Sequence, residues 1–252
     1  MASKQVIYAM IPARIGSSRL KMKNLALIDG NPMIFYAVQA AKESGVFDKI
    51  IINSDHEVFG KIADRYGVDF YLRSAKLGSS TTKSDDVVAD FMQAHPQAEV
   101  MAWVNSIAPL QNGDEVYRVV NHFLNEGLDS LITVEEKQVH CTFNGKPVNY
   151  AHDSPFALTQ ELTPVDAFVY SIMMWRRDTF LDQFAQKGFA LLCGKFGTYP
   201  VSKITSTIVK TESDLKLVEH IFRTEQNNGQ YQEIVYDSIV EKIKSPIHEK
   251  NE

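Results

Sequence analysis

The sequence predicts an α/β protein built around a mostly parallel, mixed β-sheet flanked by helices. Short apolar runs alternate with helical patterns of about 10–15 residues along most of the chain, which is typical of βαβ units. The apolar runs are continuous, as expected for strands that are covered on both faces. With 252 residues, of which 44% are hydrophobic and 23% are charged, the chain has the composition of a globular protein and can bury a sizeable core.

The predicted elements follow one another with few interruptions. Strands are expected at 6–11, 49–54, 68–73, 100–106, 130–136 and 168–175. Helices are expected at 33–44, 56–67, 84–95, 113–127, 177–188 and 213–229. Pro32 suits the first turn of a helix, Gly45 and Gly67 should end helices, and Ser84 should cap one.

The pattern changes between about 137 and 164, where turn-forming residues dominate. Within this stretch Asn144-Gly145 predicts a β-hairpin. We interpret it as a small β-rich insertion in a main domain that spans 1–230. Residues 231–252 are expected to form a weak C-terminal helix and a frayed tail.

Charge and apolar content argue against two classes of partner. The formal net charge of −5 is unlike the basic excess of a nucleic-acid binder, although a local cluster of cations can still attract small anions. No apolar run reaches the roughly 18 residues of a membrane span, and the N-terminus lacks a signal-peptide pattern. We therefore expect a cytoplasmic protein in which Cys141 and Cys193 are reduced thiols, a disulfide being the less favoured alternative.

A small basic loop follows the first predicted strand. The stretch 11–24, IPARIGSSRLKMKN, contains the cations Arg14, Arg19, Lys21 and Lys23, with a glycine and two serines among them. Backbone N–H groups and cations at such a strand–loop–helix edge hold phosphates in α/β proteins. The spacing of a Walker A motif or of G-x-G-x-x-G is absent. We favour phosphate binding here over the alternative of a solvated basic surface loop.

Six segments then stand in a recognisable order along about 5–222. They are IPARIGSSRLKMKNLALIDGNPMI, SGVFDKIIINSDHEVFGKIADRYG, YLRSAKLGSSTTKSDDVV, WVNSIAPLQNGDEV, TQELTP and KTESDLKLVEHI. Together they resemble the motifs of the acylneuraminate cytidylyltransferases, the CMP-sialic acid synthetase group, and of the related CMP-Kdo synthetases.

The resemblance implies a Rossmann-like nucleotidyltransferase fold and a defined reaction. In that reaction a 2-keto-3-deoxy sugar acid attacks the α-phosphorus of CTP, giving a CMP-sugar and pyrophosphate. Its partners would be CTP and the sugar acid, with no nucleic acid and no membrane. The insertion of about 137–164 matches the family's dimer arm, so the resemblance also implies a homodimer with composite sites.

The resemblance further implies roles for individual residues. Phosphate-holding cations are expected at Arg14 and Lys23. Nucleotide contacts are expected at Ala13, Gly16, Ser17, Asn24, Arg73, Thr82 and Ser84. Sugar-acid contacts are expected at Asn105, which stands where the family has Gln, and at Gln160. Asp55 either faces the same crevice or caps a helix.

The chain differs from the family at the positions where the family has its metal-binding carboxylates. The carboxylates of the family's D-x-D-T-x-x-D-L fall on Ile208 and Lys210, and neither offers the oxygen ligands that Mg²⁺ prefers. Glu212 and Asp214 follow, but they are expected to begin the next helix. We therefore predict no protein metal ligand. Mg²⁺ would either arrive with the triphosphate and its waters, or have its charge supplied in part by Lys210 acting as a catalytic cation.

Three questions stay open from the sequence. The chain could be an active enzyme, or a catalytically degenerate homologue that binds a nucleotide or sugar acid without turnover. The sugar could be a sialic acid-like nonulosonate or a Kdo-like octulosonate. The choice of cytosine as the base is implied only by the resemblance.

Overall fold

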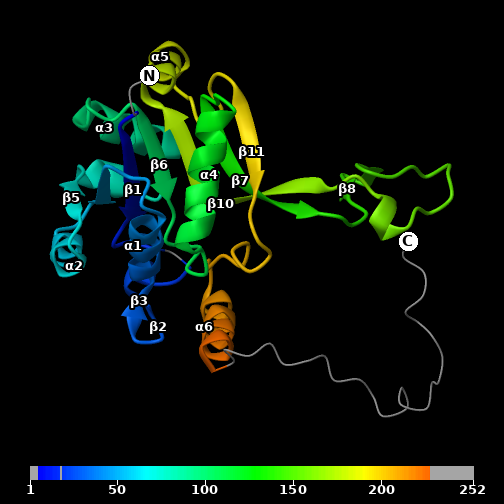
Figure 1. Cartoon of the computed structure of the whole chain (residues 1–252), viewed down its shortest axis with the longest axis horizontal. Helices are drawn as coiled ribbons and strands as arrows, with labels where there is room; N and C mark the ends of the chain where they lie inside the picture. Colours follow the sequence, from blue (N-terminus) through cyan, green and yellow to red (C-terminus); the bar gives the residue numbers. More distant parts are fainter. Residues whose placement is uncertain (1–4, 18, 228–252) are drawn as a thin grey trace.

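The computed structural model describes residues 5–17 and 19–227, and its centre is a seven-stranded sheet (Figure 1). In spatial order the strands are β11 (Phe196–Pro200), β7 (Ser130–Lys137), β10 (Val165–Arg176), β6 (Val100–Val104), β1 (Ile7–Ala13), β4 (Lys49–Ser54) and β5 (Asp69–Leu72). Neighbouring strands are parallel except at β10, which runs antiparallel to β6 and β7. The predicted mostly parallel mixed sheet is therefore confirmed.

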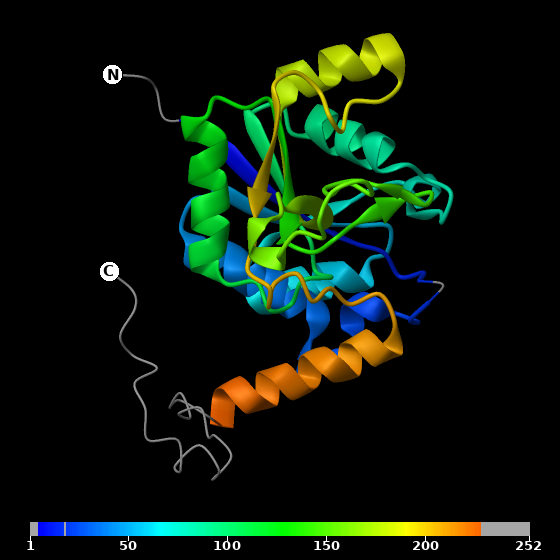
Figure 2. The same ribbon diagram turned by 90° about the vertical axis from the view of Figure 1, so that its right-hand side faces the viewer.

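Helices cover both faces of this sheet (Figure 2). The helices on one face are α1 (Met33–Ser44), α2 (Val58–Tyr66) and α4 (Gly113–Asn125). Those on the other face are α3 (Ser84–Ala94) and α5 (Arg177–Lys187). Burial on both sides explains why the strand sequences are continuously apolar.

A smaller apolar cluster fixes the last helix. Helix α6 (Glu212–Asn227) buries Val218 against Ile28 and Met33. Ile28 belongs to a short hairpin of β2 (Leu27–Ile28) and β3 (Asn31–Pro32) that precedes α1. The segment before α6 is thereby held beside the loop that follows β1.

Most predicted boundaries agree with the structure to within two residues. Gly45 (φ 66°) and Gly67 (φ 58°) adopt the left-handed conformation after α1 and α2, as predicted. The prediction of Ser84 as a helix cap was wrong. Lys83 has the extended backbone of the N-cap, and Ser84 is the first residue of α3. Strand β11 was not predicted.

An arm projects from the sheet beyond the ends of β7 and β10 (Figure 1). It contains the two-residue strands β8 (Thr142–Phe143) and β9 (Lys146–Pro147). Asn144 (φ 50°) and Gly145 (φ 74°) form the turn between them, which confirms the predicted hairpin. The register between β7 and β10 shifts between Phe168 and Met173, so the strands are bent where the arm leaves the sheet.

Other predictions concern single residues and the C-terminus. Cys141 and Cys193 are both free thiols, and Met173 and Met174 are buried in the core. The predicted C-terminal helix and tail at 231–252 lie outside the described residues. Within 5–17 and 19–227, no helix combines the length and the apolar character needed to cross a membrane.

Candidate functional site

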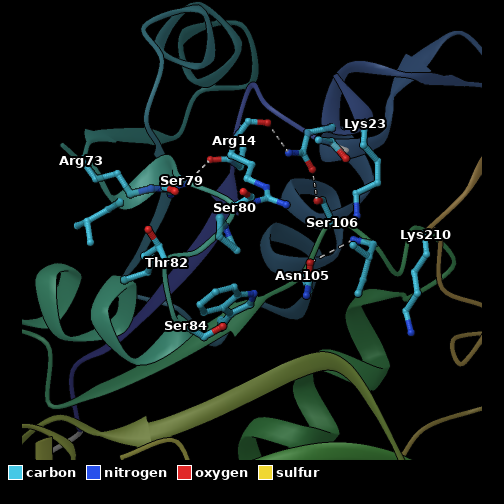
Figure 3. A pocket seen from close by; sticks show the side chains of 18 of the residues that line it. Arg14, Lys23, Arg73, Ser79, Ser80, Thr82, Ser84, Asn105, Ser106 and Lys210 are labelled. Carbon is cyan, nitrogen blue, oxygen red and sulfur yellow. Dashed lines mark hydrogen bonds between the residues drawn. The ribbon is translucent and has the colours of Figure 1, made fainter. Parts of the chain in front are cut away.

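A cavity of about 420 Å³ lies at the carboxyl ends of β1 and β6 (Figure 3). Four segments form its wall: the loop after β1, the stretch leading into α3, the end of β6, and Lys210 just before α6. Ligands of open α/β sheets bind at this edge, where several strand ends face one crevice.

Most of the residues predicted for a site line this cavity. They are Ala13, Arg14, Ser17, Lys23, Asn24, Arg73, Thr82, Ser84, Asn105 and Lys210. Gly16 and Gln160 are not among the lining residues. Gly16 is exposed in the loop after β1, and Gln160 is exposed in the short 3₁₀ helix Thr159–Glu161 of the arm. Gly16 belongs to the loop that borders the cavity and Gln160 belongs to the arm, and the nucleotide and sugar-acid contacts expected for them stay predictions.

The cavity is strongly cationic. Five basic residues line it, namely Arg14, Arg19, Lys23, Arg73 and Lys210, and no Asp or Glu is among the described lining residues. The protein as a whole carries a net charge of −5. A concentration of positive charge inside an acidic chain is an electrostatic trap for a multiply charged anion.

Lys23 is the most perturbed of these cations. Its pKa is lowered from the ordinary 10.5 to about 8, first by burial and then by the charges of Arg19, Arg14 and Lys210 in that order. Its ammonium donates to the backbone carbonyl of Val209 at 3.4 Å. The site therefore holds a lysine whose positive charge is poorly compensated by the protein, and a bound anion would compensate it.

Asn24 links the loop after β1 to the end of β6. Its side-chain amide donates to the carbonyl of Arg14 at 3.3 Å, and its Oδ1 accepts from the hydroxyl of Ser106 at 2.7 Å. Both side chains are buried, Asn24 at 5% exposure and Ser106 at 1%. This pair holds the backbone of the basic loop in one position against the sheet.

Arg73 ties the ends of two central strands together rather than pointing freely into the cavity. Its Nη2 donates to the carbonyl of Ala13 at 2.8 Å, and its Nη1 donates to the carbonyl and side chain of Asn53 at 2.7 and 3.0 Å. Burial lowers the pKa of Arg73, and the nearby carboxylate of Asp55 opposes this shift. Nε of Arg73 is buried without a partner among the described residues.

Asp55 fits neither of the two alternatives that the sequence left open. The N-cap position of α2 is taken by Glu57, so Asp55 does not cap the helix. Its Oδ1 accepts from the backbone N–H of Ile15 at 3.3 Å and lies 3.8 Å from Nη2 of Arg73. A Cβ on Gly78 would collide with this carboxylate, which explains a glycine there. Asp55 therefore positions the loop from outside the cavity.

The side of the cavity next to α3 is uncharged and polar. Hydroxyl groups come from Ser79, Ser80, Thr82 and Ser84, and Thr82 donates to the carbonyl of Lys76 at 2.9 Å. Trp103 from β6 also lines the cavity, and its indole N–H is buried without a partner among the described residues. A buried donor without a protein partner requires an explanation, and an acceptor group of a ligand is one candidate.

Asn105 is largely occupied within the protein. Its Nδ2 donates to the carbonyl of Tyr170 at 3.2 Å, and its Oδ1 accepts from the backbone N–H of Ile107 at 3.3 Å. Tyr170 has a φ of 60°, which is strained for a residue other than glycine. Asn105 therefore shapes the turn after β6 and the bulge in β10.

Sequence reasoning missed several lining residues. Ser79, Ser80, Trp103 and Ser106 were not singled out, and Arg19 was noted only as part of the basic loop. Ser106 comes two residues after the apolar run 100–104, which was the signal that it stands at a strand end. Trp103 lies inside that run and gave no signal beyond that of core packing.

The described residues do not fit a protein-bound Mg²⁺. No group of three or more His, Cys, Asp or Glu side chains gathers anywhere within 5–17 and 19–227. Glu212 and Asp214 lie in the first turn of α6, as expected. Oδ2 of Asp214 accepts from the backbone N–H groups of Lys210 at 2.9 Å and Thr211 at 2.8 Å. Glu212 pairs with Lys216 at 2.8 Å. The two carboxylates that follow Lys210 in sequence are therefore already paired within the protein.

Known proteins resemble the whole described domain. Residues 8–235 match the family model described as "Cytidylyltransferase". The chain is 25% identical to "N-acylneuraminate cytidylyltransferase" of Streptococcus agalactiae serotype V, over 89% of this chain and 56% of that protein. It is 28% identical to "Post-translational flagellin modification protein B" of Campylobacter coli, over 86% of this chain and 95% of that protein. The chain thus spans little more than half the length of the streptococcal relative.

Solved structures share the fold at low sequence identity. CMP:2-keto-3-deoxy-manno-octonic acid synthetase complexed with CTP gives a TM-score of 0.68 at 18% identity, covering 88% of this chain and 100% of that one. The 4-diphosphocytidyl-2C-methyl-D-erythritol synthase from Anaerococcus prevotii gives 0.64 at 13% identity, with the same coverage. The Rossmann-like nucleotidyltransferase fold implied by the sequence is confirmed.

Proposed function

The chain belongs to the cytidylyltransferase family, and we propose that it activates a 2-keto-3-deoxy sugar acid with CTP to give a CMP-sugar and pyrophosphate. The observation that carries this proposal is the cationic cavity, with five basic residues and no described carboxylate in its lining. Relatives named N-acylneuraminate cytidylyltransferase and a CTP-bound structural neighbour support the choice of nucleotide and sugar class.

The chemistry requires charge stabilisation more than proton transfer. The anomeric oxygen of the sugar acid attacks the α-phosphorus while the bond to the bridging oxygen breaks, and pyrophosphate leaves with that electron pair. The proton of the anomeric hydroxyl passes to water. Fixed cations lower the barrier by stabilising the negative charge that shifts toward the leaving oxygens. In our proposal Arg14, Lys23 and Lys210 have this role.

The uncharged polar side of the cavity suits the nucleoside. The hydroxyls of Thr82 and Ser84 and the unused indole N–H of Trp103 offer hydrogen bonds without charge. Arg73 acts as a positioning residue, since its guanidinium holds the backbone of Ala13 rather than a ligand. The sugar acid would then approach from the side of Asn105.

Pyrophosphate release from the purified protein tests the proposal. CTP and the other nucleoside triphosphates are each combined with a panel of nonulosonic and octulosonic acids. We expect release with CTP and one class of acid only. Lys23→Met should abolish most of it, whereas Lys21→Met, a charge-matched change at an exposed residue that does not line the cavity, should not. Release with another nucleotide, or with no acid present, would contradict the proposal.

A catalytically degenerate homologue is the second candidate, because the family's carboxylates are replaced at Ile208 and Lys210. Such a protein would bind CTP and gain thermal stability, about 2.7 kcal/mol at a 100-fold excess over Kd. It would release no pyrophosphate with any sugar acid. Calorimetric titration of CTP run beside the activity panel separates the two candidates.

We further propose that the protein is a homodimer joined through the arm. Large apolar side chains are exposed there, namely Val139, Phe143, Val148, Phe156 and Leu158. A cluster of this kind is typical of a protein interface. Light scattering should give twice the chain mass of 28.4 kDa. Phe156→Ser should shift it toward the monomer, whereas Phe189→Ser, at an exposed site outside the arm, should not.

A further inference from the structure

We propose that the site binds the metal-free triphosphate, with Lys210 in the position where a divalent cation would otherwise offset the phosphate charge. The inference rests on the proposed function, because it specifies which ionic form of the nucleotide is the substrate. It makes Mg²⁺ a competitor for the nucleotide rather than a cofactor of the protein.

The first argument is the composition of the cavity wall. Its charged groups among the described residues are all cations, whereas Mg²⁺ is held in proteins by carboxylates together with substrate phosphates. A magnesium ion brought in on a triphosphate would lie among like charges with no protein ligand to offset them. The free triphosphate carries more negative charge than its magnesium complex, so it matches the cationic wall better.

The second argument is the way Lys210 is held. Val209 is fully buried, and its N–H donates to the carbonyl of Ile107 at 2.7 Å. The N–H of Lys210 donates to Asp214 at 2.9 Å. The backbone of Lys210 is thus fixed on both sides, while its side chain remains exposed at the cavity.

The third argument is the relation of Lys210 to Lys23. Both line the cavity (Figure 3), and the ammonium of Lys23 reaches the carbonyl of Val209, the residue before Lys210. Lys210 is close enough to disfavour the charged form of Lys23. Two lysines from distant parts of the chain therefore line the same cavity. Asp214, four residues after Lys210, uses its Oδ2 to accept from the backbone N–H groups of Lys210 and Thr211.

The test is a calorimetric titration of CTP and, separately, of inorganic triphosphate, in EDTA and at increasing Mg²⁺. We expect binding in EDTA, and an apparent Kd that rises with Mg²⁺ in proportion to the ligand that is withdrawn as its magnesium complex. Lys210→Ala should weaken binding in EDTA roughly tenfold or more, as expected for a charge-assisted contact. Lys203→Ala, on the same segment but outside the cavity lining, should not.

A designed reversal gives a second measurement. Ile208→Asp combined with Lys210→Asp should make binding of CTP tighten with Mg²⁺, the opposite sign to the native protein. If that variant does not fold, the sign of the Mg²⁺ effect on the native protein still decides.

The outcomes separate the inference from the function it rests on. Binding of CTP by the native protein only when Mg²⁺ is present would overturn the inference and leave the proposed function intact. Binding of inorganic triphosphate in EDTA without any binding of CTP would support the cation site and contradict the function. Absence of binding with both ligands under all conditions would overturn both.

Discussion

The lowered pKa of Lys23 gives a prediction whose sign can be worked out. Between its folded value of about 8 and its ordinary value of 10.5, the unfolded chain binds a proton that the ligand-free folded protein does not. The stability of the ligand-free protein should therefore rise with pH across that interval, and the cost of the charged lysine is fully present below about pH 8. The difference between the two pKa values of Lys23 corresponds to about 3 kcal/mol in the free energy of unfolding. This figure is an upper limit, because solvent screens a half-buried group.

A bound triphosphate reverses this preference. Its negative charge favours the protonated lysine and raises the pKa of Lys23, so binding above pH 8 should take up a proton. CTP affinity should be nearly constant below pH 8 and fall up to tenfold per pH unit above it. The terminal phosphate titrates near pH 6, well below this interval, so it does not confuse the profile.

The assay is calorimetry at pH 8.5 in two buffers with different ionisation enthalpies, together with a Kd profile from pH 7 to about pH 10. Proton uptake appears as a buffer-dependent heat. Lys23→Arg should remove both the uptake and the slope, because arginine stays protonated throughout. Lys21→Arg, at an exposed residue outside the cavity lining, should keep them. A native profile that is flat to pH 10, or a slope that persists in Lys23→Arg, would refute the reasoning.

Three further predictions concern neighbouring groups. Ser106→Ala leaves the buried Oδ1 of Asn24 without its 2.7 Å donor, so the free energy of unfolding in urea should fall by about 1–3 kcal/mol; an unchanged urea midpoint would contradict this. Arg73→Lys loses the guanidinium group that donates to the carbonyl of Ala13. It should lower the free energy of unfolding in urea by at least as much as Ser106→Ala does. Trp103→Phe removes an unpartnered N–H, so it should weaken CTP binding while leaving the melting temperature nearly unchanged; equal affinity would exclude that donor.

The sheet and the basic loop could be predicted because their causes are local. Strands buried on both faces need continuous apolar sequence, and a glycine in the left-handed conformation ends a helix at Gly45 and at Gly67. Strand β11 could not be predicted, because Gly197 and Pro200 weaken its pattern and its order comes from pairing with β7.

The sequence predicted which residues gather at the candidate site, but not which of them contact a ligand and which hold the protein backbone. The resemblance placed Arg73 beside the nucleotide. In the structure its guanidinium donates instead to the backbone carbonyls of Asn53 and Ala13, which are 20 and 60 residues away in sequence. Trp103 sits in a strand and could be recognised only from its unused donor. Such roles depend on burial and on distant partners, and a single sequence carries neither.

The charge of Lys23 should destabilise the ligand-free fold while it favours triphosphate binding. The variant Lys23→Met tests both effects. Most substitutions destabilise a protein, but this one removes a charge that the ligand-free fold holds at a cost. It loses the 3.4 Å contact to Val209, worth about 1 kcal/mol. It also removes the cost of burying the charged ammonium and, second, its repulsion from the neighbouring cations, together up to about 3 kcal/mol. At pH 7 the ligand-free variant should therefore unfold at a higher urea concentration than the native protein, and the gain should vanish as the pH approaches 10. Triphosphate should stabilise the native protein far more than the variant. A variant less stable than the native protein at pH 7 would mean that burial of the lysine stem, not its charge, dominates at this position.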